Sequence, residues 1–289
     1  MRALAWIALV AAALALLAGC AGMTRLAYNN ADLIVRKMAN DYLDLDATQS
    51  EELRVRARRF HQWHRANELP QYAAFLRTAE QRFSKGMTAE DVAWAMSTAR
   101  TRYRALAVKA IDDTASMLAG LSQEQISLLD RKLSDNNARY ARDLLPADER
   151  KRVRVQTRRM VDALRQWTGE VSRDQEARVE RFVRAHDRHA ALRLEDRQRL
   201  QRDAVGLLRQ RLPAKELAPR LAKLFTEPDY RRSEEFRRED KRWETDLGKL
   251  LVELYGTLSP AQRAHVVKRI ESYADDFGVL AGEARKSAV

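Results

Sequence analysis

Residues Gly120 to Gln125 read Gly-Leu-Ser-Gln-Glu-Gln, and this short stretch decides how the chain folds. The glycine is placed to end one helix in the left-handed conformation. Ser122 is placed to cap the next helix, and Gln125 stands at its third position, where the amide can return a hydrogen bond to the cap. Such a capping box satisfies two backbone N–H groups that otherwise lack partners. The stretch therefore predicts two helices joined by a tight turn.

The same signature occurs along the whole chain. A cap followed three positions later by an acidic or amide side chain is found at Thr88/Asp91, Ser122/Gln125, Ser172/Gln175 and Ser259/Gln262, with Asp46/Gln49 as a fifth candidate. Glycines expected to end the preceding helices in the left-handed conformation are Gly86, Gly120, Gly169 and Gly256.

Apolar residues recur at a spacing of three or four between these turns, and the alternation typical of strands is nearly absent. We expect helices near 25–44, 47–67, 70–85, 88–119, 122–145, 147–168, 172–212, 214–225, 229–255 and 259–277. The predicted fold class is all-α. It is a multi-helix bundle of consecutive antiparallel helical hairpins, with one long helix near 172–212.

Two asparagines, Asn136 and Asn137, interrupt the apolar stripe of the helix expected at 122–145. A buried asparagine needs hydrogen-bond partners. One of the two is therefore expected to bond a neighbouring helix and fix its register. Contact with a ligand is the alternative.

The first twenty residues predict export of the protein and a membrane anchor. An apolar run over 3–18 follows Arg2 and closes as Leu17-Ala18-Gly19-Cys20. The run is shorter than the about 20 residues of a spanning helix, and it ends in small residues as a cleavable signal does. The ending resembles the lipobox of bacterial lipoproteins, which implies cleavage before Cys20 and a lipid on its thiol. A free thiol after an uncleaved anchor helix is the alternative.

The predicted organisation has four parts. Residues 1–19 are a lipoprotein signal peptide, 20–24 a lipidated tether, 25–278 a single helical domain with a candidate seam near 213–229, and 279–289 a flexible tail. Cys20 is the only cysteine, so the mature domain has no internal disulfide. Ala21 stands where an aspartate favours inner-membrane retention of lipoproteins, so the resemblance implies the outer membrane, facing the periplasm.

The chain is strongly basic, and cleavage of the segment containing Arg2 lowers its net charge from +12 to +11. The expected partners are the membrane, through the lipid anchor, and an anionic lipid, lipopolysaccharide or envelope protein. Export excludes nucleic acid as a partner. The candidate anionic-surface contacts are Arg150, Lys151, Arg152, Arg154, Arg158 and Arg159, which have no acidic residue among them. The arginine-rich composition is an alternative explanation for the charge.

Catalytic and metal-binding patterns do not emerge from the sequence. The pairs His61/His64 and His186/His189 each share a helix face, but neither has a third ligand at helical spacing. Packing or surface positions are the expected roles of these histidines. We expect no catalytic residue, no metal and no cofactor apart from the covalent lipid on Cys20, and hence no enzyme.

Two resemblances bear on function. Arg25-Leu-Ala-Tyr-Asn-Asn-Ala-Asp32 and Trp63-His64-Arg65 resemble an uncharacterised lipoprotein family of Gram-negative bacteria, a domain of unknown function. A second similarity is to the LTxxQ signature of small Spy-like periplasmic chaperones, which are basic and all-helical. Two stretches of the chain carry it, Leu121-Ser-Gln-Glu-Gln125 and Leu258-Ser-Pro-Ala-Gln262. This chain is much longer and has Ser in place of Thr, and a capping box also explains the motif.

The function expected from these features is that of a non-enzymatic outer-membrane lipoprotein. Its periplasm-facing helical domain binds another envelope component. The alternative is a membrane-anchored periplasmic chaperone or stress-adaptor protein.

Overall fold

The computed structural model describes residues 23–230 and 232–286, and within these ranges the chain forms helices and turns without strands. The predicted all-α fold is confirmed. The helices are α2 (Met23–Asn29), α3 (Ala31–Leu43), α4 (Ala47–Asn67), α5 (Leu69–Lys85), α6 (Ala89–Ala119), α7 (Gln123–Leu144), α8 (Glu149–Thr168), α9 (Arg173–Ala185), α10 (His189–Arg209), α11 (Ala214–Thr226), the 3₁₀ turn η1 (Pro228–Tyr230), α12 (Glu234–Gly256) and α13 (Pro260–Lys286). The predicted signal peptide, the lipobox and Cys20 lie outside the described residues.

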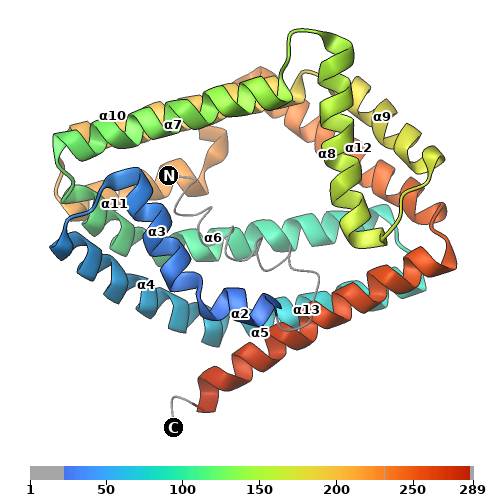
Figure 1. The fold of residues 1–289 in the computed structure, drawn as a ribbon, viewed down its shortest axis with the longest axis horizontal. Coiled ribbons are helices and arrows are strands. Elements are labelled where there is room, and N and C mark those ends of the chain that lie inside the picture. The colour runs from blue at the N-terminus through green and yellow to red at the C-terminus, as the bar shows by residue number, and fades with distance from the viewer. Residues whose placement is uncertain (1–22, 231, 287–289) are drawn as a thin grey trace.

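The helices form a four-sided frame (Figure 1). Helices α7 and α10 run together along one long side, and α5, α6 and α13 along the other. Helices α8, α9 and α12 occupy one end, while α3, α4 and α11 occupy the opposite end. None of the described helices has the length and apolarity needed to cross a membrane.

Three clusters of buried apolar side chains hold the frame together. The largest joins α3, α4, α6, α7, α10 and α11. A second joins α2, α5 and α13, and a third joins α8, α9 and α12. The stacked rings of Phe75 on α5 and Trp94 on α6, with centroids 4.9 Å apart, link two helices along one side.

The most extensive helix pairings join helices that are far apart in the sequence. Helix α13 packs along α5, α11 along α6, and α10 along α7. Consecutive pairing, as predicted, is found for α3 with α4 and for α8 with α9, and to a smaller extent for α4 with α5 and for α10 with α11. The expectation of consecutive hairpins throughout is therefore wrong, because local turn signals do not determine which helices meet.

The single long helix predicted for 172–212 is two helices, α9 and α10, separated by residues 186–188. The break contains neither glycine nor proline. His186 is the first residue of the break and His189 the first residue after it, and both side chains turn inward to carboxylates on α12. These tertiary contacts explain the interruption.

Both predicted ends of the domain also need correction. Helix α2 begins at Met23, inside the expected tether, and Thr24 is buried. Helix α13 continues to Lys286, so the flexible tail predicted from 279 is wrong for 279–286. Leu280 is completely buried in the α5–α13 cluster. Near the candidate seam, α11 contributes the buried Leu217 and Leu221 to the largest core.

All five predicted capping boxes are confirmed, and Ser259 and Gln262 exchange their two hydrogen bonds like the other four pairs. The prediction of left-handed glycines holds for Gly86, with φ of 118°, and Gly169, with φ of 79°. It is wrong for Gly120, whose φ is −85°, and for Gly256, which remains inside α12.

Asn137 donates to Gln201 of α10 over 2.6 Å, so the expected register contact of α7 is confirmed.

Capping glutamines from two different turns also bond each other. Gln49 at the start of α4 and Gln125 at the start of α7 exchange Nε2–Oε1 hydrogen bonds of 3.2 and 2.6 Å. The remaining N–H of Gln125 reaches the carbonyl of Asp44 before α4, and that of Gln49 reaches the carbonyl of Gly120 before α7. We call this arrangement the first glutamine clasp.

A second glutamine clasp repeats the arrangement between the α8–α9 and α12–α13 turns. Gln175 and Gln262 exchange amide hydrogen bonds of 3.1 and 3.0 Å. Gln175 also donates to Thr257, and Gln262 donates to the carbonyl of Glu170. Each clasp thus joins two hairpin turns that are distant in the sequence.

The two types of glycine predict opposite responses to alanine. Gly86→Ala is expected to lower the free energy of unfolding by about 1 kcal/mol, because side-chain-bearing residues rarely adopt positive φ. Gly120→Ala is expected to be neutral or slightly stabilising, since an added Cβ makes only an ordinary 3.6 Å contact with the Met117 carbonyl. Urea unfolding measures both, and equal destabilisation by the two variants would contradict the assignment.

The first glutamine clasp predicts energetic coupling. Gln49→Met and Gln125→Met each leave the partner amide with unpaired groups, whereas the double variant removes both. A double-mutant cycle in urea should give a coupling of about 1–3 kcal/mol. The control cycle combines Gln49→Met with Gln262→Met, which belong to different clasps and should be additive. Additivity within the clasp would show that its hydrogen bonds contribute nothing.

Candidate functional site

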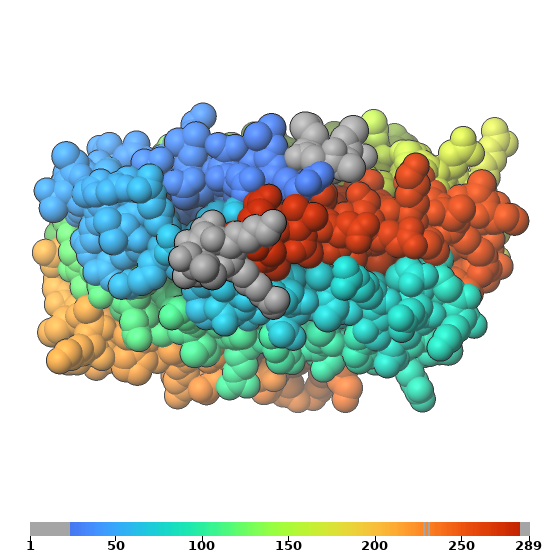
Figure 2. Space-filling view, turned by 90° about the horizontal axis from the view of Figure 1, so that it is seen from below, coloured from blue at the N-terminus to red at the C-terminus, as the bar shows by residue number. Residues whose placement is uncertain are grey.

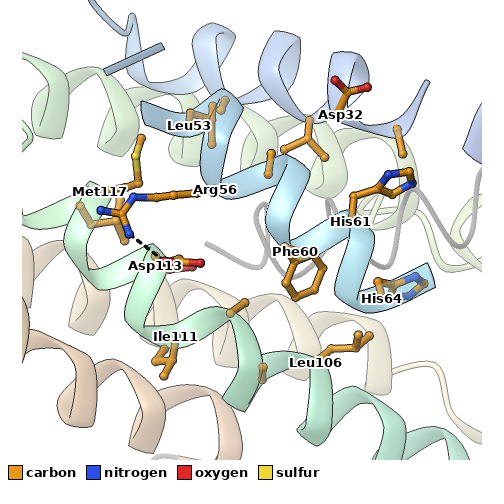
Figure 3. Close-up of a pocket in the computed structure, with 18 of the residues that line it drawn as sticks. Asp32, Leu53, Arg56, Phe60, His61, His64, Leu106, Ile111, Asp113 and Met117 are labelled. Carbon is orange, nitrogen blue, oxygen red and sulfur yellow. Dashed lines mark hydrogen bonds and ion pairs between the residues drawn. The ribbon is translucent and has the colours of Figure 1, made fainter. Parts of the chain in front are cut away.

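An apolar cavity of about 170 Å³ lies beside the largest core, between α3, α4 and α6, with Phe225 of α11 also contributing (Figure 3). The lining residues of α4 run from Leu53 to His64, and those of α6 from Tyr103 to Leu118. At 1.5 Å per residue these segments span roughly 16 and 22 Å of helix. The lining of the cavity therefore extends over several turns of both helices.

Small and aliphatic side chains form most of its wall. They are Ala31, Val35, Ala39 and Leu43 before α4; Leu53 and Ala57 on α4; and Leu106, Ala107, Ala110, Ile111, Met117 and Leu118 on α6. Alanine at the helix contacts leaves space that a larger side chain would fill. Such a wall suits an apolar ligand and offers few hydrogen bonds.

An ion pair lies toward one end of the cavity. Arg56 and Phe60 project from α4 toward α6, where Arg56 Nη1 lies 2.7 Å from Asp113 Oδ1 (Figure 3). Arg56 also pairs with Glu52, and Arg59 with the same Asp113. The charge of Arg56 is thus neutralised by groups of the protein itself.

An aromatic hydrogen-bonded pair lies toward the other end. The Tyr28 hydroxyl, on α2, is 2.8 Å from His64 Nδ1 on α4. Burial lowers the pKa of His64 to about 4, with a further contribution from His61. Burial also raises the pKa of the Tyr28 phenol. At neutral pH both groups are therefore uncharged, and a hydrogen bond joins the phenol oxygen to Nδ1.

The Nε2 atoms of His61 and His64 are buried and have no hydrogen-bond partner among the described residues. An uncharged, enclosed imidazole next to a protonated phenol is poorly suited to acid–base catalysis near neutral pH. The arrangement fixes α2 to α4 beside the cavity.

The second histidine pair lies far from this cavity, at the break between α9 and α10. His186 contacts Glu239 through Nδ1 at 2.9 Å and Asp246 through Nε2 at 3.3 Å. His189 contacts Asp240 at 3.2 Å and stacks on Trp243. Both histidines are buried, and each has its own carboxylate partners. Within the described ranges no three His, Cys, Asp or Glu side chains gather in a geometry that could hold a metal ion.

Five of the six basic residues singled out from the sequence form an exposed surface on α8. The basic surface of α8 consists of Arg150, Lys151, Arg154, Arg158 and Arg159. Arg152 is instead engaged within the protein. It donates to the carbonyls of Pro146 and Ala147 and lies 3.4 Å from Asp187. The cavity was missed from the sequence, where its alanines look like ordinary helix residues.

The buried His64 predicts a specific dependence of stability on pH. Its pKa is about 4 in the folded state and about 6.5 when unfolded, so between these values the unfolded chain binds more protons. Stability should therefore fall as the pH is lowered from about 6.5 to about 4, with about 3 kcal/mol due to this group. His64→Gln should reduce that loss in urea unfolding at pH 7 and pH 4.

If stability depends on pH in the same way in the wild type and in His64→Gln, the assignment of His64 as an uncharged, buried side chain is contradicted.

Comparisons with known proteins identify a family but no activity. No curated protein and no solved structure shows significant similarity to the chain. One family model matches residues 41–237, which cover the chain from the end of α3 to the first turn of α12 and include the α4 and α6 walls of the cavity. The chain therefore belongs to the family of unknown function DUF6279.

Proposed function

We propose that this protein is a non-enzymatic lipoprotein, anchored through Cys20 in the outer membrane and facing the periplasm, whose helical domain binds an anionic envelope component. The observation that carries the proposal is that α2 and α3, which expose leucines next to the expected anchor, lie on the same face of the frame as the basic surface of α8, although α3 and α8 are at opposite ends of it.

The short connection to the anchor supports a position close to the membrane. Two residues, Ala21 and Gly22, lie between Cys20 and Met23, so the two Cα atoms are about 11 Å apart at most. Helix α2 is in turn fixed to the body of the domain, because Thr24 is buried and Arg25 pairs with Asp276 of α13 over 2.9 Å. A lipid on Cys20 would therefore hold α2 and α3 at the bilayer surface.

The chemistry of this face suits such a surface. Helices α3 and α8 lie at the front of Figure 1, and α2, α3 and α8 lie along the upper edge of Figure 2. Leu26 and Leu33 are 62% and 55% exposed and would provide apolar contact with the membrane surface. The basic surface of α8 would add attraction to anionic headgroups over about one Debye length.

The motifs similar to the chaperone signature have a structural role. Leu121 and Gln125 belong to the largest core and the first glutamine clasp, and Gln262 belongs to the second. No observation on the described residues favours client binding over binding of an envelope component.

The anchor is tested in cells. Cys20→Ser should abolish fatty-acid labelling and leave an uncleaved precursor, because serine offers no thiol for acylation. Fatty-acid labelling that survives the substitution would refute the proposal that the protein is a lipoprotein anchored through Cys20.

The basic surface is tested with the chain from Ala21 to Val289 and vesicles containing anionic lipid. Binding should weaken as salt rises, and Arg154→Glu, Arg158→Glu and Arg159→Glu together should abolish it. The control triple, Lys215→Glu, Arg220→Glu and Lys223→Glu, makes the same charge change on α11, at the other end of the frame. Equal loss of vesicle binding in both triple variants would indicate that binding depends on net charge alone. Binding that does not change with salt would refute an electrostatic surface.

A further inference from the structure

We propose that the cavity between α3, α4 and α6 binds a single acyl chain, which lies along the helices while its polar head remains outside. The expectation that the chain comes from a nearby membrane rests on the proposed function. The affinity for an acyl chain does not, so the two proposals can fail separately.

The volume of the cavity limits the part of a ligand that it can enclose. An apolar cavity of about 150 Å³ can enclose one benzene molecule. The similar volume here, about 170 Å³, therefore encloses only about as many carbon atoms as one ring, such as one end of an acyl chain. The lining continues along α4 from Leu53 to His64 and along α6 from Tyr103 to Leu118, which provides apolar helix surface for the methylene groups that follow.

The charges of the cavity favour binding through the chain itself. Arg56 is the one arginine or lysine among the described lining residues, and Glu52 and Asp113 already neutralise it. The Tyr28 hydroxyl is bonded to His64, and the free imidazole nitrogens are enclosed. No cation is therefore available to hold a carboxylate inside, and apolar contact with the walls must provide the affinity.

The position of the cavity favours a lipid as the source. Ala31 and Val35 line it from α3, the same helix that exposes Leu33 on the face proposed to meet the membrane. The expected lipidated Cys20 precedes α2, whose Tyr28 also lines the cavity. Acyl chains of the anchor and of the bilayer are thus the nearest apolar molecules.

The experiment uses the chain from Ala21 to Val289, which contains every described helix, and tritiated hexadecanol as a probe with an uncharged head. Saturable binding of about one probe per chain is expected. Ala57→Leu with Ala110→Leu fills the cavity from α4 and α6 and should weaken binding at least tenfold. The matched control is Ala66→Leu with Ala99→Leu, which adds the same methylene groups at exposed positions of the same helices and should change affinity less than twofold.

The possible failures are distinct. Absence of saturable binding overturns the proposal, as does equal binding by the filled and control variants. Helicity and urea midpoints of both variants establish that each is folded. If the filled variant does not fold, the milder Ala110→Val takes its place, with Ala99→Val as control and a threefold loss of affinity as the expected result.

A second arm distinguishes the two lipid sources. Mature lipidated protein from membranes is compared with the lipid-free chain in the same binding assay. If only the lipid-free chain takes up hexadecanol, the protein's own acyl chain occupies the cavity in the lipidated form and excludes the probe. Equal uptake by both would identify a bilayer lipid as the occupant. Both outcomes support an acyl-chain site.

Discussion

The pairing of glutamine amides between hairpin turns is the interaction on which the rest of the structure depends. In the first clasp, Gln125 Oε1 accepts from the Ser122 N–H and from Gln49, while its amide N–H groups donate to Gln49 and to the Asp44 carbonyl. Every donor and acceptor of the side chain is thus used. Glutamate cannot replace it, because a carboxylate has no N–H to donate. The second clasp uses Gln262 in the same way.

These clasps explain how a frame can form without one continuous core. Each clasp satisfies the start of two helices and the end of the two that precede them, and it does so where two turns meet. The three apolar clusters can then lie on separate sides of the frame, since the turns provide fixed corners between them.

Local features of the fold could be predicted from the sequence, whereas its long-range contacts could not. Capping boxes depend on residues three positions apart, and all five marked a real helix start. The break at 186–188 depends on carboxylates of α12, more than fifty residues away, and the burial of Leu280 depends on α5. The run of basic residues at 150–159 could be recognised from the sequence, but the engagement of Arg152 with Asp187 required the turn after α9. The cavity required α3, α4 and α6 together.

The positions of the clasps along the chain have a consequence for the order of folding. The first clasp closes a loop between residues 76 positions apart, and the second between residues 87 positions apart. Loop-closure entropy rises slowly with length, so the two closures carry similar costs of a few kcal/mol. The first clasp can form as soon as residue 125 has been synthesised. The second clasp must wait for Gln262, near the end of the chain. The end of the frame built on α3, α4 and α7 can therefore mature first, and docking of α13 on α5 completes the molecule.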